Sequence, residues 1–286
     1  MHQRVAAIND LSGLGRCSLT ADIAVLAAMG LECCPLPTAV LTTQTGYPDY
    51  RCVSFTNHME DYRQHWQQLG VSFQGILSGY LATPEAASHV EAFLDAFQKP
   101  GTLYLCDPVL GDNGHVYRGF SGEHIRSMQQ LALRADILTP NLTEFCILTG
   151  TEVEPLFKLG REDPAALFRV LQEKASIFKG KKLVITGIPH SSPSGEHLVT
   201  NLVLDQGRME PVTFPHLGGT YSGTGDLFAA VLLGSQLQGR SLVRDAQLAG
   251  ELIGKAIQSS KAEGTPGNDG VNYEAYLYLG SVTTNG

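Results

Sequence analysis

The stretch GGTYSGTGDLFAAVLLG, residues 218–234, decides the fold, because it places small, flexible residues immediately before an apolar run. Four glycines precede Asp226, and the residues that follow predict a helix over 227–238. Glycines allow a ligand to approach the bare backbone, and a helix N-terminus carries partial positive charge, so this pattern is typical of a phosphate-binding loop. We therefore expect an anion site in the loop residues Gly223, Thr224 and Gly225.

Asp226 has two interpretations, because a carboxylate beside a phosphate is electrostatically unfavourable. It can be a general base that contacts an attacking alcohol and accepts its proton. It can instead be a helix cap, which stabilises a helix by about 1 kcal/mol and requires no ligand. The glycines on both sides favour the base, since a cap alone does not need them.

Outside this stretch, short apolar runs alternate with segments of helical periodicity, which predicts an α/β fold with a mostly parallel sheet. The expected strands are Val5–Ile8, Cys33–Val40, Gly75–Ser78, Leu103–Cys106, Ile137–Leu138 and Leu183–Thr186. The expected helices are Leu19–Met29, Asp61–Leu69, Pro84–Gln98, Glu123–Leu133, Asn141–Leu148, Pro164–Lys179, Leu227–Gln238 and Leu242–Ser260. Segments His197–Leu204 and Met209–Pro215 flank DQGR and predict an antiparallel hairpin at a sheet edge.

Composition excludes several classes of protein. The chain has 286 residues, of which 43% are hydrophobic and 17% charged, as in an ordinary globular protein. The net charge of −8 and the scattered Lys and Arg residues exclude a nucleic-acid-binding face. The six cysteines show no C-x-x-C spacing, so neither a disulfide framework nor a zinc site is expected.

The chain also lacks the marks of targeting and of domain linkers. The N-terminal residues MHQRVAAIND contain no apolar core of signal-peptide length, and no segment approaches the roughly 18 apolar residues of a membrane span. We therefore expect a cytoplasmic protein with no membrane contact. No linker rich in Pro, Ser or Gly interrupts the sequence, which favours a single domain over residues 1–286.

Polar residues follow the expected strands, where open α/β sheets bind their ligands. In LYLCDPVLGDNGHVY, residues 103–117, Asp107 and Asp112 can hold a hydrated Mg²⁺ or a monovalent cation near nucleotide phosphates, or can lie in a solvated turn. In ADILTPNLTEF, residues 135–145, Asn141 and Glu144 have the spacing of a capping box. The same two side chains can instead face the ligand, with Glu144 ordering the waters of Mg²⁺.

Three further loops are candidates for ligand contacts. Asp10 can hydrogen-bond a ring nitrogen or hydroxyl, or be a turn residue, and its loop matches neither the G-x-G-x-x-G nor the P-loop pattern. In TTQTGYPDY, residues 42–50, Thr45 and Tyr47 can bind and stack on a flat ring, although a hydrophilic loop has a similar composition. Thr186 and Gly187 lie at a strand end, where they can contact a nucleotide phosphate.

Four segments in this order resemble the ribokinase-like superfamily, and more narrowly its pyridoxal kinase branch, which phosphorylates vitamin B6. They are TQTGY (43–47), CDPVLGD (106–112), TPNLTE (139–144) and SGTGDLFAA (222–230). The resemblance runs from Val5 to about Leu252. It implies a three-layer sandwich with helices on both faces of the sheet, a homodimer, and transfer of the γ-phosphoryl of ATP to a ring hydroxymethyl group with Mg²⁺ and a K⁺ or Na⁺ ion.

The resemblance also assigns roles to residues. Asp226 is the base, and the anion hole consists of Gly223, Thr224 and Gly225. The nucleotide side consists of Asp107, Asn141, Glu144, Thr186, Gly187, Gly223 and Gly225. The cations are served by Asp112, Thr139 and Glu144. The B6 vitamer is faced by Asp10, Thr45, Tyr47, Tyr80 and Asp226.

The first substrate loop departs from the pyridoxal kinase pattern. Asn9, Asp10 and Leu11 stand where pyridoxal kinases carry a Ser-His pair, and Gln44 stands where they usually have His. NDLSGLG partly resembles the hydroxymethylpyrimidine kinases of thiamine synthesis, so such a kinase is an alternative. A non-catalytic nucleotide-binding regulator of the same fold is another, against which the intact Asp226 argues. A carboxylate at Asp10 favours a protonated ring nitrogen.

Overall fold

The computed structural model describes residues 3–279 and consists of two compact units. Unit 1 comprises Met1–Asp107 and Leu217–Gly286, and unit 2 comprises Pro108–His216. All six cysteines lie in the described part of the chain and carry free thiols, as expected. The expectation of a single domain over residues 1–286 stays a prediction.

Unit 1 is built on a sheet of parallel strands with one antiparallel edge. Its strand order is β5-β4-β1-β2-β3. Strands β1, β2, β4 and β5 pair in parallel, and β3 is antiparallel to β2. The bounds are β1 Arg4–Ser12, β2 Glu32–Leu41, β3 Cys52–Ser54, β4 Gly75–Ser78 and β5 Leu103–Cys106.

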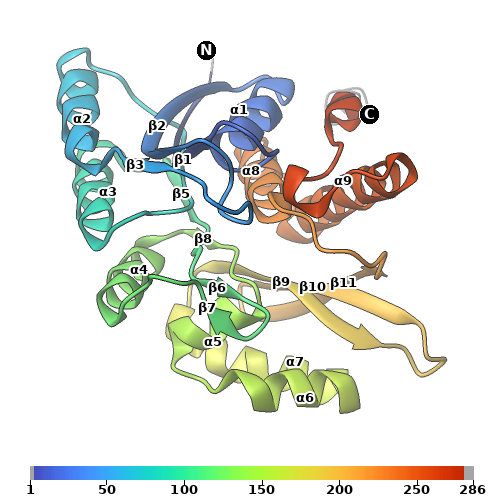
Figure 1. Cartoon of the computed structure of the whole chain (residues 1–286). Helices are drawn as coiled ribbons and strands as arrows, with labels where there is room; N and C mark the ends of the chain where they lie inside the picture. The colour runs from blue at the N-terminus through green and yellow to red at the C-terminus, as the bar shows by residue number, and fades with distance from the viewer. Residues whose placement is uncertain (1–2, 280–286) are drawn as a thin grey trace. The chain divides into compact units, whose positions relative to one another are not determined.

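Helices cover both faces of this sheet, with α1, α8 and α9 on one side and α2 and α3 on the other (Figure 1). Helix α8 is buried along all of 227–236, as expected of a helix that is apolar all round. The α-helices are α1 Ser18–Ala28, α2 Met59–Gln68, α3 Pro84–Phe97, α8 Thr224–Leu237 and α9 Leu242–Glu263. The 3-10 helices are η1 Thr56–His58, η3 Gly267–Asp269 and η4 Glu274–Leu279.

Unit 2 contains the predicted hairpin. Its strand order is β11-β10-β9-β8, with β8 parallel to β9 and the other pairs antiparallel. The strands are β8 Ile137–Leu138, β9 Lys182–Ser191, β10 His197–Asp205 and β11 Arg208–Pro215, beside a two-stranded pair of β6 Gly111–Asp112 and β7 His115–Val116. The helices are α4 Gly122–Arg134, α5 Leu142–Thr149, α6 Val153–Glu162, α7 Pro164–Lys174 and η2 Ala175–Phe178. Helices α5, α6 and α7 lie on one side of the β9–β11 ribbon (Figure 1).

The predicted fold class is confirmed: the chain is an α/β protein with a mostly parallel sheet and an antiparallel hairpin at its edge. One expectation about the helices was wrong: the expected helix over 164–179 is α7 followed by the 3-10 turn η2. Helix α6 and the strands β3, β6 and β7 were not predicted.

Two predicted strands are longer than expected, because each continues past a bulge in the sheet. The β1–β2 register shifts between Asn9 and Leu11, where Asp10 inside β1 stands opposite Thr38 and Ala39 of β2. The β9–β10 register shifts between Thr200 and Leu202, where Thr186 and Gly187 stand opposite a single residue. Bulges redirect side chains and often occur beside ligand sites. The bulge of β9 falls on two residues that the sequence predicts to bind ligands, and the bulge of β2 lies opposite a third, Asp10.

Candidate active site

The N-terminus of α8 forms a loop of unoccupied backbone N–H groups. The helix begins at Thr224 after Gly223, whose φ of 81° is left-handed. A Cβ on Gly223 would lie 2.0 Å from the carbonyl oxygen of Arg16, so no side chain fits there. Among residues 3–279, no backbone carbonyl outside the regular helix pattern accepts from the N–H groups of Gly223, Thr224 or Gly225. These groups are therefore free to bind an anion.

Asp226 lies in the first turn of α8 and is half-buried rather than enclosed. Its Oδ1 accepts a hydrogen bond from Asn9 Nδ2 at 3.0 Å, and its carboxylate also accepts from the backbone N–H of Ser18. Asn9 is on β1 and Ser18 is the first residue of α1. Three elements of unit 1 thus fix the predicted base, whereas a simple helix cap would bond only to its own helix.

The electrostatic surroundings weaken the acidity of Asp226. Burial raises its pKa from 3.8 to about 6, and the negative charge of Asp10 adds to this effect. The hydrogen bonds from Ser18 and Asn9 act in the opposite direction. The pKa is close to neutral pH, where a general base is most effective.

Asp10 is almost fully buried in the same cluster. Its Oδ1 accepts from Ser18 Oγ at 2.6 Å and its Oδ2 from Ser12 Oγ at 2.8 Å. Burial raises its pKa. Ser18 holds this arrangement with a φ of 53°, an uncommon conformation for a residue other than glycine. Because both oxygens of Asp10 already accept serine hydroxyls, its contact with a ring nitrogen stays a prediction.

The predicted ring-binding loop, residues 42–50, forms hydrogen bonds with η3. Gln44 Nε2 donates to the carbonyl of Asn268 at 3.1 Å, and Asn268 Nδ2 donates to the carbonyl of Gly46 at 2.9 Å. The Tyr47 hydroxyl donates to Asp269, and this bond raises the pKa of Tyr47. The hydroxyl of Tyr47 is therefore already hydrogen-bonded within the protein, and its ring is the part left for a ligand.

The same helix η3 also contacts the other two loops of the site. Arg16 N–H donates to the carbonyl of Asp269 at 3.0 Å, and Ser222 N–H donates to the carbonyl of Gly267 at 3.0 Å. Helix η3 thus forms hydrogen bonds with three loops: the glycine loop after β1, the loop 42–50 and the loop before α8. Thr45 is exposed in this group.

Tyr80 and Asp107 lie at the ends of β4 and β5 in unit 1. Tyr80 N–H donates to Asn9 Oδ1 at 2.8 Å, and burial raises the pKa of the Tyr80 hydroxyl to about 12. Asp107 is 8% exposed, and a Cβ on Gly225 would lie 3.7 Å from its Oδ2. The structure therefore brings the predicted base, anion loop and ring-binding residues together with Asp107.

The remaining predicted residues lie in unit 2. Asn141 and Glu144 form the capping box of α5, with Glu144 N–H donating to Asn141 Oδ1 at 2.9 Å and Asn141 N–H donating to Glu144 Oε2 at 2.8 Å. Glu144 Oε1 also accepts from the N–H of Leu110 at 3.2 Å. The capping interpretation is confirmed for both residues, and their role toward a ligand stays a prediction.

Thr186 and Gly187 form the bulge of β9. Gly187 has a φ of 67° and its N–H donates to Asn201 Oδ1 at 3.0 Å. Thr186 N–H donates to the carbonyl of Pro140 at 2.8 Å. The bulge leaves Gly187 exposed, so its surface is available to a ligand.

The predicted cation residues do not form a cage of protein ligands. Asp112 is exposed and accepts from its neighbour Asn113, while Thr139 is 3% exposed. Within residues 3–279, no three His, Cys, Asp or Glu side chains gather as a metal site. Mg²⁺ commonly keeps several waters and binds one or two carboxylates together with substrate phosphates, so the exposed oxygens of Asp112 fit such an ion.

Three features were missed in the sequence. Asn9 links the base to β1, Asp22 accepts from the same amide, and η3 joins the loops. A signal existed only for Asp22, a charged residue inside the otherwise apolar helix 19–29. Asn9 was expected, with Asp10, among the polar residues that follow the strands, but no pattern indicated its bond to Asp226.

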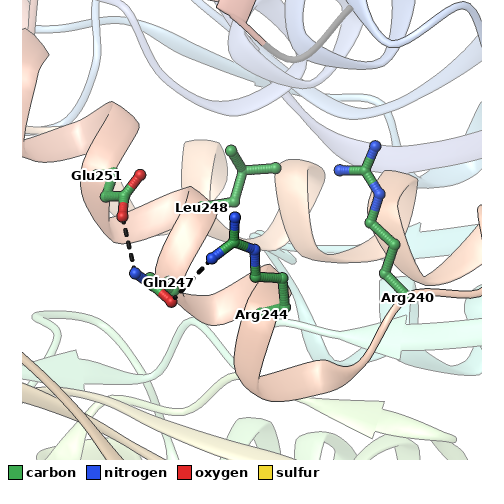
Figure 2. A pocket seen from close by; sticks show the side chains of 5 residues that line it. All are labelled: Arg240, Arg244, Gln247, Leu248 and Glu251. Atoms are coloured by element: carbon green, nitrogen blue, oxygen red, sulfur yellow. Dashed lines mark hydrogen bonds between the residues drawn. The ribbon is translucent and has the colours of Figure 1, made fainter. Parts of the chain in front are cut away.

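Figure 2 shows a separate surface pocket of about 180 Å³ on α9, where Gln247 donates to Glu251. It is lined by Arg240, Arg244, Gln247, Leu248 and Glu251, none of which is a predicted site residue.

In the described part of the chain, no helix is both long enough and apolar enough for a membrane span.

Comparison with known proteins supports the resemblance seen in the sequence. The chain is 28% identical over 243 residues to a pyridoxine/pyridoxal/pyridoxamine kinase of Bordetella avium, covering 82% of this chain and 78% of that protein. A Bacteroides thetaiotaomicron protein described as a phosphomethylpyrimidine kinase, solved with pyridoxal, is 34% identical, with a TM-score of 0.85 over 98% of this chain and 96% of that one. The pyridoxal kinase of Lactobacillus plantarum is 28% identical, with a TM-score of 0.84 over 99% and 97% of the two chains.

The family model described as phosphomethylpyrimidine kinase matches residues 15–272, which is most of the chain. This span contains the α8 loop, the capping box of α5 and η3. Together with the whole-chain structural matches, it shows that the chain belongs to the phosphomethylpyrimidine kinase family, as the resemblance to the ribokinase-like superfamily implied.

Proposed function

We propose that the protein is a kinase that transfers the γ-phosphoryl group of ATP to the hydroxymethyl group of a B6 vitamer. The observation that carries this proposal is the half-buried Asp226, held by Asn9 beside the free N–H groups of the α8 loop. A carboxylate with a raised pKa next to an anion site suits proton removal from an alcohol during phosphoryl transfer.

The residues of unit 1 act by binding and orientation. The N–H groups of Gly223, Thr224 and Gly225 and the positive end of α8 bind the migrating phosphoryl group. Asp226 accepts the proton of the attacking hydroxymethyl group, and its bonds to Asn9 and Ser18 keep the carboxylate aimed at that oxygen. Loop 42–50 and Tyr80 bind the ring.

Unit 2 contains the residues proposed for the nucleotide and the cations. Thr186 and Gly187 bind a nucleotide phosphate at the β9 bulge, and Asn141 and Glu144 hold the nearby backbone. Asp112, Thr139 and Glu144 would hold Mg²⁺ and a monovalent K⁺ or Na⁺ ion, and the bound Mg²⁺ would supply positive charge beside the phosphates of the nucleotide. We also propose that the protein is a homodimer and that it is cytoplasmic.

The choice of a B6 vitamer is supported by the relatives. The Bordetella avium relative is named for pyridoxine, pyridoxal and pyridoxamine, and the Bacteroides thetaiotaomicron protein was solved with pyridoxal. A hydroxymethylpyrimidine kinase remains the second candidate, because the matching family is described as phosphomethylpyrimidine kinase.

A coupled assay of ATP consumption tests both candidates. We expect turnover with pyridoxal, pyridoxine or pyridoxamine and a lower kcat/KM with hydroxymethylpyrimidine. Asp226→Asn should lower kcat by roughly 10²- to 10⁴-fold with little change in nucleotide affinity. Asp61→Asn, at a side chain that is 75% exposed on α2, is the matched control. Nucleotide binding without turnover of any of these acceptors would favour a non-catalytic regulator and refute the proposal.

A further inference from the structure

Asp22 is a buried carboxyl group that the proposed reaction does not use. It lies on α1 and is 0% exposed. Its Oδ2 accepts a hydrogen bond from Asn9 Nδ2 at 3.1 Å, while its Oδ1 has no hydrogen-bond partner among residues 3–279. A buried polar atom without a partner is unfavourable, so a residue that persists in this state calls for an explanation.

Asn9 connects Asp22 directly to the proposed base. The same amide nitrogen donates to Asp226 Oδ1 at 3.0 Å and to Asp22 Oδ2 at 3.1 Å. The side-chain oxygen of Asn9, Oδ1, accepts hydrogen bonds from the backbone N–H groups of Asp10 and Tyr80 at 3.0 and 2.8 Å. Two donors and two acceptors are satisfied, which determines the orientation of the amide. Asp22 therefore supplies the second acceptor for the amide nitrogen that donates to Asp226.

The charged groups that raise the pKa of Asp22 are all acidic. They are Asp226 on α8, Asp107 after β5 and Asp10 on β1, and Asp22 in turn raises the pKa of Cys33 on β2 and of Tyr273. Burial and the charge of Asp226 raise the pKa of Asp22 well above 3.8. An ionised Asp22 would be an uncompensated buried charge, whereas a neutral carboxyl group avoids most of the desolvation penalty.

We propose that Asp22, in its neutral protonated form, is a positioning residue that holds the Asn9 amide against Asp226. This inference rests on the proposed function of Asp226 as the base. A neutral Asp22 gives Asn9 an acceptor without placing a second negative charge beside the base. The carboxylate of Asp226 is then the ionised member of the pair, and burial and the charge of Asp10 raise its pKa against the hydrogen bonds from Ser18 and Asn9.

Two substitutions separate this role from a merely structural one. Asp22→Asn preserves an acceptor oxygen and the neutral state, so kcat should stay within about threefold of wild type, and the acid limb of the pH profile should not move. Asp22→Leu removes the acceptor. It should lower kcat by about 10- to 100-fold with the KM for ATP unchanged, because the base is misaligned while the nucleotide site is intact.

Asp22→Asn keeps the test decisive even if Asp22→Leu fails to fold. If Asp22 were ionised in the working enzyme, removal of its charge would lower the acid-limb pKa of kcat by about one unit or more, and that shift would overturn the proposal. Wild-type kcat in a folded Asp22→Leu protein would overturn it equally.

The Asp226→Asn variant distinguishes failure of this inference from failure of the proposed function. If Asp226→Asn loses turnover and Asp22→Leu does not, the positioning role alone is refuted. If Asp226→Asn retains turnover, the base assignment and this inference fail together. Addition of Asp22→Leu to Asp226→Asn should lower kcat no further, since a positioning residue acts only through the group that it orients.

Discussion

Asp226→Asn is expected to stabilise the folded protein at the same time as it removes turnover. Burial raises the pKa of Asp226 from 3.8 to about 6, so the folded state binds this proton more tightly than the unfolded chain does. The ionised carboxylate therefore destabilises the native state at neutral pH. Asparagine has a similar shape and no charge, so it resembles the protonated acid.

The size of the effect follows from the two pKa values. The difference between 3.8 and about 6 corresponds to about 3 kcal/mol of folding free energy above pH 6. The amide has one acceptor oxygen where the carboxylate has two, and the carboxylate accepts from both Asn9 and Ser18. Loss of one of these bonds offsets about 1–2 kcal/mol. We expect a net gain of about 1–2 kcal/mol.

Urea unfolding of both proteins, followed through the single tryptophan, Trp66, measures this gain. The gain should be full at about pH 8 and diminish as the pH falls through about 6; below about 4 only the loss of about 1–2 kcal/mol from the missing bond should remain. The kcat of wild type should fall through the same acid limb, because protonated Asp226 cannot accept a proton. The exposed control Asp61→Asn should leave the acid limb of kcat unchanged. A variant less stable than wild type at pH 8, or a gain independent of pH, would refute the reasoning.

Three further variants test separate parts of the site. Gly223→Ala should destabilise the fold by about 2 kcal/mol or more and abolish turnover, as measured by urea unfolding and the coupled assay, because φ is 81° and the Cβ would meet the carbonyl of Arg16. Glu144→Gln should lower stability by about 1–2 kcal/mol through loss of one capping bond; a kcat with altered Mg²⁺ dependence would indicate a cation role in addition. Tyr47→Phe should raise the KM for the acceptor by roughly 3- to 10-fold with kcat nearly unchanged, since loop 42–50 loses its bond to Asp269.

Local patterns in the sequence were sufficient for much of the fold. Strands β4, β5 and β8 have the predicted bounds, because short buried strands appear as continuous apolar runs. The helix α6 was missed because VEPLFKLGRE contains Pro155 and Gly160 and buries few residues. The strand β3 has only three residues, all exposed, at the sheet edge. Such elements depend on their neighbours rather than on their own periodicity.

The candidate site also contains some residues that local sequence patterns predict and others that depend on the folded chain. The α8 loop could be predicted because its glycines, its aspartate and its helix are consecutive in the chain. The bond between Asn9 and Asp226 spans 217 residues, and the bond between Tyr47 and Asp269 spans 222. Local patterns mark Asp226 and Tyr47 but not the roles of Asn9 and Asp269, because these two become meaningful only when the chain is folded. A sequence therefore indicates the reacting groups more readily than the residues that orient them.

The direction of the pKa shift distinguishes the two interpretations of Asp226. A carboxylate that only caps an exposed helix end has a lowered pKa, since the helix N-terminus and the donated N–H groups favour the charge. Asp226 accepts such bonds from Asn9 and from the first residue of α1, yet burial and Asp10 outweigh them and raise its pKa to about 6. A cap gains nothing from this arrangement, because the charge destabilises the fold. A base benefits from the same arrangement, because its pKa is raised toward the working pH. Asp10→Asn removes one of the charges that raise this pKa, so it should move the acid limb of kcat to lower pH.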